Sequence, residues 1–265
     1  MQTIIRKANK SGNSSAVVLP RAWLNKRVKV ELVDKGSEEI LKDVLDIVSD
    51  KIKLEEIIGV YLVGSYARGD YDDDSDIDVL IITKDVDREL IKEGAYEILL
   101  VSKELLYQKM DGNILPIGPM LYEAKPLLNA DFLESVEIKI TKKNIGWYID
   151  TTKSALKISE KAIKIDKELG LEKIGDAVAY SLILRLRTLY IIECLKENKK
   201  LRKNEFLKLV KRVSGSIIAY ERYVYSKNKS GRNKDCLPIV EAEKLIDYID
   251  KENKGLEKWA KGRKD

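Results

Sequence analysis

Two short stretches decide how this chain folds: Leu62-Val63-Gly64-Ser65-Tyr66-Ala67-Arg68-Gly69, and Ser75-Asp76-Ile77-Asp78-Val79-Leu80-Ile81. Apolar runs lead into the first and fill the second, which predicts strands at Ile57 to Val63 and Ile77 to Thr83. Glycine after a strand allows a tight turn and a close backbone approach. Backbone amides and the Ser65 hydroxyl can then hold phosphate oxygens where the next helix begins. The sequence therefore predicts a phosphate-binding turn at Gly64 and Ser65.

Asp76 and Asp78 stand two residues apart in the second stretch. On a strand both side chains leave the same face, while Ile77 and Val79 point into the core. Two like charges this close cost free energy unless a cation neutralises them. Magnesium takes one or two carboxylates plus substrate phosphates, so the pair predicts a metal site. An acidic surface loop is the alternative; it suits the preceding aspartates, Asp70, Asp72, Asp73 and Asp74, but not the alternation of the pair with apolar residues.

A third carboxylate is expected from a neighbouring strand, because it would help to bind the metal or take the proton of the acceptor. Glu97 lies in the predicted strand Tyr96 to Val101, and a buried carboxylate there needs a partner. We expect Asp85, Asp87 and Glu89 in a turn or helix, and Glu93 outside the strand. Glu97 is therefore the predicted third catalytic and metal-binding residue. A sheet-edge glutamate that faces water is the alternative.

The two stretches resemble the polymerase-beta-type nucleotidyltransferase superfamily. Small members carry Gly-Ser-x-Ala-Arg-Gly, as Gly64 to Gly69 does here, and Ser-Asp-Ile-Asp, as Ser75 to Asp78 does. The resemblance covers about residues 37 to 140. It implies a bound nucleoside triphosphate, with ATP expected, and two Mg²⁺ ions, replaceable by Mn²⁺, on Asp76 and Asp78. It also implies attack by an acceptor hydroxyl on the α-phosphorus, with pyrophosphate leaving.

Arg68 has two possible roles. Its guanidinium can reach triphosphate oxygens as a bidentate donor, which makes it the third predicted nucleotide-binding residue after Gly64 and Ser65. It can instead pair with the local aspartates and hold the loop.

Composition narrows the chemistry. The 265 residues are enough for more than one domain. The chain has no histidine, which excludes Ser-His-Asp and Cys-His catalysis and zinc sites that use imidazole. Acid–base and metal chemistry must then use carboxylates, which prefer hard ions. Cys194 and Cys236 are too few for a disulfide framework. Neither a membrane-spanning run nor a signal peptide is expected, so we predict a soluble, cytoplasmic protein.

The first 34 residues form a separate basic segment. Up to Val30 it has seven basic residues and no acidic one. Strands are expected near Thr3 to Lys7, Ala16 to Leu19 and Arg27 to Leu32, with a turn around Gly12. So small a unit rarely buries enough surface alone, so we expect a homodimer. The segment resembles half of a swapped-hairpin AbrB-type domain, which implies DNA binding; this rests on Lys10-Ser11-Gly12-Asn13-Ser14-Ser15, Ala16-Val17-Val18-Leu19-Pro20 and Val28-Lys29-Val30. A basic hairpin docked on the rest of the chain is the alternative.

Beyond Lys142 the pattern becomes helical. Helices are expected near residues 143–168, 173–197, 203–213, 215–227 and 239–260. The bundle loosely resembles HEPN domains and the substrate domains of antibiotic nucleotidyltransferases. Ribonuclease HEPN domains use Arg followed by His, and Arg185 and Arg187 have no such partner. The bundle is therefore expected to bind the acceptor or to mediate dimerisation. Its basic stretch around Lys199 to Arg212 is read as a solvated face or a polyanion site.

The sequence as a whole predicts an α+β protein with a basic β hairpin segment (1–34), a nucleotidyltransferase domain with a mixed sheet (37–140) and a helical bundle (141–265). The predicted function is metal-dependent transfer of a nucleoside monophosphate to a hydroxyl of a protein, an RNA or a small molecule, including an aminoglycoside-type acceptor. The alternative is a DNA-binding, antitoxin-like regulator whose transferase domain senses nucleotide.

Overall fold

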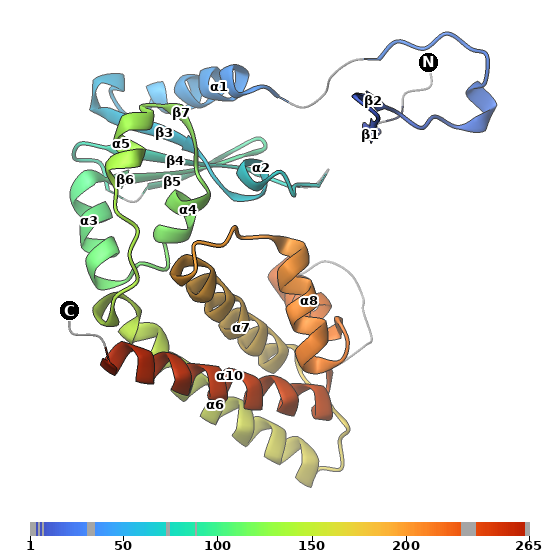
Figure 1. The fold of residues 1–265 in the computed structure, drawn as a ribbon, viewed down its shortest axis with the longest axis vertical. Helices are drawn as coiled ribbons and strands as arrows, with labels where there is room; N and C mark the ends of the chain where they lie inside the picture. The colour runs from blue at the N-terminus through green and yellow to red at the C-terminus, as the bar shows by residue number, and fades with distance from the viewer. Residues whose placement is uncertain are drawn as a thin grey trace. The chain divides into compact units, whose positions relative to one another are not determined.

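A computed structural model describes residues 4, 6, 8–30, 35–72, 75–87, 89–228 and 237–262. The chain divides into two compact units, Met1–Gly36 and Ser37–Asp265 (Figure 1). In the part of the chain that the structure describes, every helix is too short or too polar to cross a lipid bilayer.

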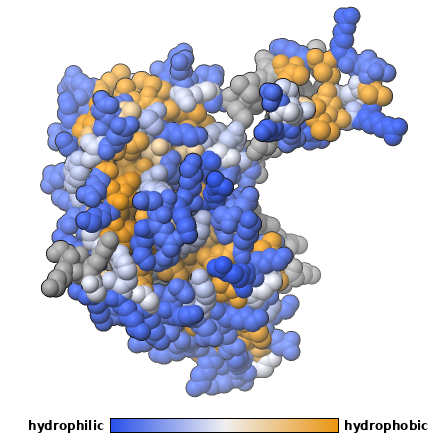
Figure 2. All heavy atoms as spheres, viewed as in Figure 1, coloured by the Kyte–Doolittle hydropathy of each residue, from blue (hydrophilic) through white to orange (hydrophobic). Residues whose placement is uncertain are grey.

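The first unit contains one short hairpin. Strand β1 (Asn9–Ser11) pairs antiparallel with β2 (Ser14–Ala16) through a tight turn at Gly12, whose φ is +60°. A 3-10 helix, η1, follows at Arg21–Trp23. Among the described residues of this unit none is buried, and Figure 2 shows hydrophobic side chains at its surface.

The predicted strands of this unit need correction. The second hairpin strand ends at Ala16, so the expected strand from Ala16 to Leu19 is wrong beyond its first residue. Residues 27–30 are not in a strand, although one was expected from Arg27 to Leu32. Neither segment packs against a core that would fix an extended pairing. The expected strand near Thr3 to Lys7 lies mostly outside the described residues.

The second unit is built on a five-stranded sheet in the order β5-β6-β4-β3-β7. β4 and β6 are parallel, and the other neighbours are antiparallel. The strands are β3 (Ile57–Leu62), β4 (Ile77–Thr83), β5 (Glu89–Glu93), β6 (Tyr96–Ser102) and β7 (Lys125–Leu128).

Both faces of the sheet are buried, and the central strand β4 contributes to each. Val79 and Ile81 point to one face, where helix α1 (Ser37–Ser49) packs through the apolar stripe that includes Ile40 and Val44. Leu80 and Ile82 point to the other face, in the core shared with the helical region. This alternation places Asp78 on the same face as Leu80.

Short helices join the strands. They are η2 (Leu54–Glu56), α2 (Gly64–Arg68), α3 (Lys103–Gly112), α4 (Gly118–Glu123) and α5 (Ala130–Ser135). α4 packs against both α2 and α7, so it lies between the Gly64 turn and the helical bundle.

The helical bundle follows the predicted periods closely. Its first helix is capped by Thr141 and Asn144, whose side chains accept each other's backbone N–H. The helices are α6 (Lys142–Glu168), α7 (Asp176–Lys196), α8 (Lys203–Ser214), α9 (Ile218–Asn228) and α10 (Ile239–Gly262), with a small pairing of β8 (Lys173–Ile174) and β9 (Leu237–Pro238).

The predicted fold class is confirmed: a central mixed sheet with helices and a C-terminal helical region. One element of the sheet was assigned wrongly, because Glu89 begins strand β5 and does not lie in a turn or helix. β5 is an edge strand with one buried residue, Ile91, so its polar sequence lacks the apolar signal of a strand. The boundary expected near residue 140 stays a prediction.

Candidate active site

The Gly64 turn lies against the strand that carries Asp78. The Val63 N–H donates to the Asp78 carbonyl at 2.9 Å, and α2 begins at the next residue. Gly64 has φ +68°, and a Cβ built on it would stand 2.0 Å from Asp78 Oδ2. Only glycine combines this backbone conformation with so close an approach. The turn is therefore fixed directly beside the Asp78 carboxylate.

Asp78 and Glu97 are opposite each other on parallel strands, as register partners of β4 and β6. Both lie on the sheet face that α3 and α4 cover, and both are half-buried. Asp76 is exposed and comes immediately before β4, which begins at Ile77. The sequence placed Asp76 on the strand, so that detail is corrected by one residue. The structure thus brings Glu97 next to Asp78, as expected.

The electrostatics of this group favour a cation beside Asp78. Burial, followed by the charges of Glu97 and Asp76, raises the pKa of Asp78 to about 6. In the described residues no three carboxylates stand ready as a metal site. The donors are all hard oxygens, as Mg²⁺ prefers, and a cation beside them would remove the repulsion that raises this pKa. The residues present therefore fit a divalent ion.

A protein cation already binds Glu97. Lys92 on the edge strand β5 is its register partner, and the Lys92 Nζ donates to Glu97 Oε1. The hydrogen bond to Glu97, and the nearby charges of Asp76 and Asp78, raise the pKa of Lys92. β6 lies between β5 and β4, so Glu97 is not on a sheet edge, although its side chain is 31% exposed.

A cavity of about 560 Å³ opens beside the carboxylates. Asp78 and Glu97 lie in its wall, together with Lys109 of α3. The remaining lining is apolar: Val63, Val79, Leu90, Leu99, Val101, Leu105, Pro116, Ile117 and Met120. A largely apolar cleft or cavity with a few converging polar groups is the usual form of a small-molecule site. We therefore place the candidate active site here.

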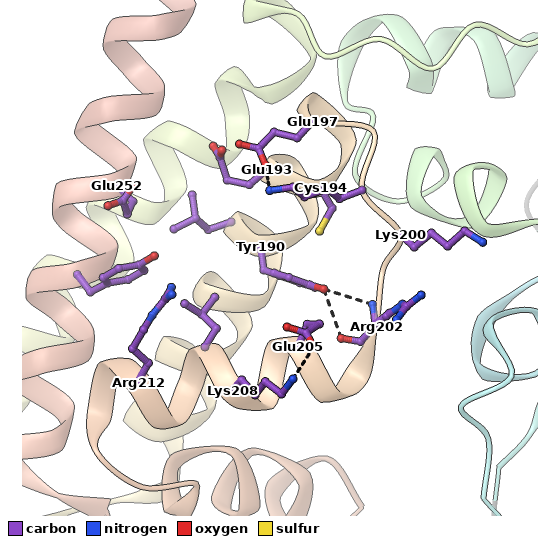
Figure 3. Close-up of a pocket in the computed structure, with 14 residues that line it drawn as sticks. Tyr190, Glu193, Cys194, Glu197, Lys200, Arg202, Glu205, Lys208, Arg212 and Glu252 are labelled. Carbon is purple, nitrogen blue, oxygen red and sulfur yellow. Dashed lines mark hydrogen bonds and ion pairs between the residues drawn. The ribbon is translucent and has the colours of Figure 1, made fainter.

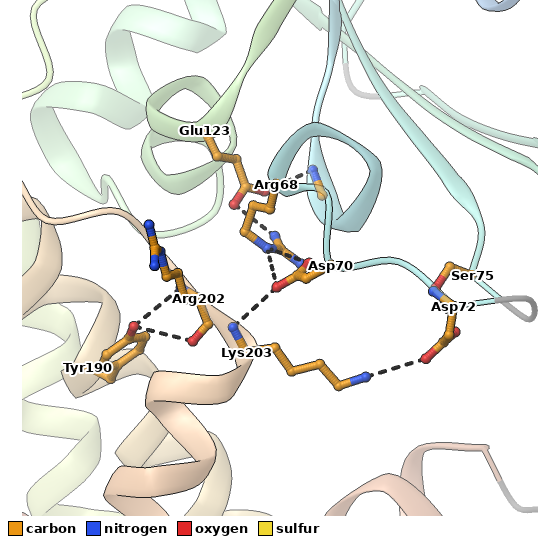
Figure 4. Close-up of polar contacts among 9 residues, drawn as sticks. Arg68, Asp70, Asp72, Ser75, Glu123, Tyr190, Arg202 and Lys203 are labelled. Atoms are coloured by element: carbon orange, nitrogen blue, oxygen red, sulfur yellow. Dashed lines mark hydrogen bonds and ion pairs between the residues drawn. The ribbon is translucent and has the colours of Figure 1, made fainter. Parts of the chain in front are cut away.

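Arg68 takes the second of its two predicted roles in this structure (Figure 4). Its Nε donates to Asp70 at 3.1 Å, and its Nη1 donates to Glu123 Oε2 at 2.7 Å. Burial opposes the charge on Arg68, but its bonds to Glu123 and Asp70 prevail and raise its pKa. The other oxygen of Glu123 accepts the Gly64 N–H at 2.8 Å. Contact between Arg68 and a nucleotide stays a prediction.

Asp70 extends this network into the helical bundle. Its Oδ2 accepts the backbone N–H of Lys203, the first residue of α8, at 3.1 Å. The Lys203 Nζ also donates to Asp72 at 3.3 Å. Asp70 therefore caps a helix that begins 133 residues later. The sequence indicated only a solvated acidic loop here; Asp73 and Asp74 lie outside the described residues.

Glu123 was missed in the sequence. It ends a short helix without a motif, so no local pattern marks it.

Ser65 is half-buried at the start of α2. Its carbonyl accepts the Gly69 N–H at 2.8 Å, which closes the short helix. In the part of the chain that is described, its hydroxyl has no hydrogen-bond partner. Contact between the Ser65 hydroxyl and a nucleotide stays a prediction.

A second cavity, of about 700 Å³, lies in the helical bundle (Figure 3). Charges of both signs line it, and Tyr190 bonds there to the backbone of Arg202 at 3.3 Å. No motif residue lines it, so we do not place the catalytic chemistry there even though it is the larger cavity. Part of the predicted basic stretch lines it: Lys199, Lys200, Arg202, Lys208 and Arg212.

The family model of the nucleotidyltransferase domain matches residues 41–211. The chain belongs to this family and is a nucleotidyltransferase of the polymerase-beta type. The resemblance stated from the sequence is confirmed in this part; the AbrB-like and HEPN-like resemblances stay predictions.

Two proteins of Methanocaldococcus jannaschii, both named as protein adenylyltransferases, are similar to this chain. One is 39% identical over 100 residues, which cover 38% of this chain and 87% of the relative. The other is 34% identical over 101 residues, which cover 33% of this chain and 99% of the relative. These relatives match about a third of this chain, and the chain covers most of each.

Two solved structures are more distant. A nucleotidyltransferase-like protein from Exiguobacterium sibiricum has a TM-score of 0.36 at 11% identity, over 82% of this chain and 75% of its own. A spectinomycin adenyltransferase from Enterococcus faecialis was solved with ATP and spectinomycin. It has a TM-score of 0.41 at 14% identity, over 81% of this chain and 98% of its own. With scores this low, the family assignment rests on the sequence matches.

Proposed function

We propose that the protein transfers a nucleoside monophosphate from a nucleoside triphosphate, with ATP expected, to an acceptor hydroxyl. The acceptor oxygen forms a bond to the α-phosphorus, and the bond from that phosphorus to the bridging oxygen breaks. Pyrophosphate leaves with the electron pair of that bond, and the hydroxyl proton passes to a carboxylate or to solvent. Such a reaction needs positioning and charge neutralisation, which suits a site without histidine.

Each predicted residue has a role in this reaction. Asp76, Asp78 and Glu97 would hold two Mg²⁺ ions, or Mn²⁺ in their place. When bound, the ions would neutralise charge on the triphosphate and the leaving pyrophosphate. Glu97 would take the acceptor proton, and the Gly64 amide region and the Ser65 hydroxyl would contact phosphate oxygens. Arg68 stays a predicted nucleotide contact.

One observation carries the proposal: Asp78 and Glu97 are opposite each other on parallel strands, and the Gly64 turn lies against Asp78. Two converging carboxylates beside a phosphate-binding turn have a chemical purpose in nucleotide transfer. As a structural feature alone the pair would be costly, since burial and like charges raise the pKa of Asp78.

We propose a protein hydroxyl as the acceptor. The names of the two relatives support this choice, and they also support ATP as the donor. An RNA or an aminoglycoside-type small molecule is the competing acceptor. The apolar lining of the cavity beside Glu97 favours neither a polyanion nor a polycation.

Label transfer tests the function directly. The protein is incubated with Mg²⁺ and each of the four nucleoside triphosphates, labelled at the α- or the γ-phosphate, with a protein, an RNA or an aminoglycoside as acceptor. We expect α-label on the protein acceptor and stoichiometric pyrophosphate. Transfer of γ-label without α-label would mean a phosphoryl transferase. Absence of any transfer with all four nucleotides would contradict the proposal.

We further propose that the first unit makes the protein a homodimer and contacts DNA. The unit is basic, and its exposed apolar residues include Val18, Leu24 and Val30, which a second copy could cover. The family match does not favour the alternative in which the protein is primarily a DNA-binding regulator.

A further inference from the structure

Glu123 occupies an unusual position for a carboxylate, at the junction of the Gly64 turn, α4 and Arg68. Its side chain is 10% exposed, and each oxygen has its own donor. Oε1 accepts the Gly64 N–H at 2.8 Å and Oε2 accepts from Arg68 at 2.7 Å (Figure 4). Both donors belong to α2, the helix that begins at the turn predicted to contact the nucleotide. Glu123 therefore acts on that turn from the side of α4.

Gly64 is held from two directions. Its N–H is bound by Glu123, and its α-carbon stands against the Asp78 carboxylate, where a Cβ would come within 2.0 Å of Oδ2. The Val63 N–H bond to the Asp78 carbonyl, at 2.9 Å, holds the start of the turn, and Glu123 holds the Gly64 amide from the side of α4. The position of Gly64 relative to Asp78 therefore depends on Glu123 as well as on the backbone of β4.

Arg68 is held from two directions as well. Glu123 takes its Nη1 and Asp70 takes its Nε, while Asp70 also accepts the Lys203 N–H of α8. Charge-assisted bonds of this kind are strong and geometrically specific. Because both ends of the guanidinium are bound in a partly buried setting, Arg68 serves here as the link between Glu123 and the bundle.

We propose, on the basis of the proposed function, that Glu123 is a positioning residue for nucleotide transfer. It fixes the Gly64–Ser65 turn against Asp78 by taking the Gly64 amide and clamping Arg68. The nucleotide phosphate is then presented to the carboxylates in one orientation. Glu123 itself touches neither nucleotide nor acceptor. α4 also carries Met120, which lines the cavity beside Glu97, so the same helix sets the turn and part of the cavity wall.

Glu123→Gln tests this role, since an amide of the same shape has a donating nitrogen in place of one of the two oxygens that accept from Gly64 and Arg68. Asp176→Asn is the matched control, because Asp176 forms a comparable pair with Arg222, which is 5% exposed, in the helical bundle. We expect Glu123→Gln to lower kcat by about 10- to 100-fold, because a small misplacement of reacting groups costs this much. The nucleotide KM should change by less than about threefold, and the control should keep both values near wild type.

Hydrogen exchange provides a readout that does not depend on activity. Amides of residues 63–69 should exchange faster in Glu123→Gln than in wild type, and Asp176→Asn should leave them unchanged. Glu123→Asp, which retains the charge but is shorter by one methylene, serves if the glutamine variant fails to fold. It should show the same faster exchange and lowered kcat.

Three outcomes decide the matter. If both Glu123 variants match the control in turnover and in hydrogen exchange, the proposal is overturned. The Arg68–Glu123 contact would then be an ordinary ion pair with no role in positioning the turn. Tighter nucleotide binding in Glu123→Gln would overturn it too, because Glu123 would then compete with phosphate for Arg68. If wild type transfers no nucleotide, the proposed function fails, while faster exchange of residues 63–69 in the variants would still support the positioning of the turn by Glu123.

Discussion

The α-carbon of Gly64 and the carboxylate of Asp78 are packed so closely that no side chain fits between them: an added Cβ would stand 2.0 Å from Oδ2. The contact joins the predicted phosphate-binding turn to the principal carboxylate of the candidate site. Substitution of Gly64 can therefore be compared with substitution of a glycine that has only a positive φ, which separates the effect of the Asp78 contact from that of backbone strain.

Gly64→Ala should abolish nucleotide transfer and destabilise the protein by about 2 to 4 kcal/mol, since it adds a clash to the strain of a positive φ. Gly69→Ala is the control, because Gly69 has φ +75° and open space around its Cβ position. It should cost only about 1 kcal/mol and leave transfer measurable. Chemical denaturation and label transfer measure both effects. Equal losses in the two variants would show that the Asp78 contact has no role.

Asp76→Asn and Asp78→Asn should each abolish Mg²⁺-dependent transfer while the fold is kept. Each substitution removes a negative charge on which metal binding would depend. In the metal-free protein the same loss relieves repulsion between the carboxylates, so the fold is not weakened. Circular dichroism checks the fold, and label transfer with added Mg²⁺ or Mn²⁺ checks the reaction. Turnover equal to wild type in either variant would remove that residue from the catalytic group.

The raised pKa of Asp78 predicts how stability depends on pH without metal. In the folded protein the Asp78 carboxyl keeps its proton up to about pH 6, whereas the ordinary pKa of an aspartate is 3.8. Stability should therefore fall as pH rises from about 4 to 6 and stay lower above it. After a discount for partial exposure, we expect a cost on the order of 1 to 2 kcal/mol.

Asp78→Asn should remove that cost, so in EDTA it should melt above wild type at pH 7.5 and close to it at pH 4. Mg²⁺ should stabilise wild type at pH 7.5 and the variant much less. Thermal melts at the two pH values, with and without metal, give the comparison. A variant less stable than wild type at pH 7.5 in EDTA would contradict the sign of this shift.

Glu97→Gln should cut the single-turnover transfer rate by orders of magnitude, with little change in nucleotide affinity, because Glu97 serves the acceptor side of the reaction. Glu93→Gln is the control, as Glu93 is exposed on the neighbouring strand β5. Its rate should equal that of wild type. Unimpaired transfer by Glu97→Gln would mean that the third carboxylate lies elsewhere or that none is used.

Removal of residues 1–34 should weaken self-association and DNA binding but leave nucleotide binding intact, because the basic residues and uncovered apolar side chains of the first unit are lost together. Sedimentation, a salt-dependent DNA shift assay and nucleotide titration measure the three properties. A truncated protein that binds DNA as tightly as the full chain would refute this interpretation.

The sequence located Asp78 and Glu97 because period-two alternation in apolar strands states which side chains share a face. The parallel pairing of β4 with β6, which sets them side by side, was expected only as neighbouring strands. Strand β5 was missed because Lys92 and its polar neighbours lie on an edge. Glu123 could not be found, since its contact with Gly64 spans 59 residues and depends on how α4 packs. Long-range polar contacts of this kind leave no periodic trace in the chain.

Asp70 accepts the first backbone N–H of α8, so the residue that directly follows the Gly64–Gly69 motif completes a helix of the bundle. The two parts are consequently poor modules for protein engineering. A fragment that ends near residue 140 would keep the whole motif, yet its Asp70 would lose Lys203 and be left to Arg68 alone. If the bundle were grafted onto another transferase, the Lys203 N–H at the start of α8 would lose the acceptor that Asp70 provides. The recipient would have to supply an aspartate at the equivalent place. Shuffling of this enzyme should therefore succeed only when the motif loop and α8 are exchanged together.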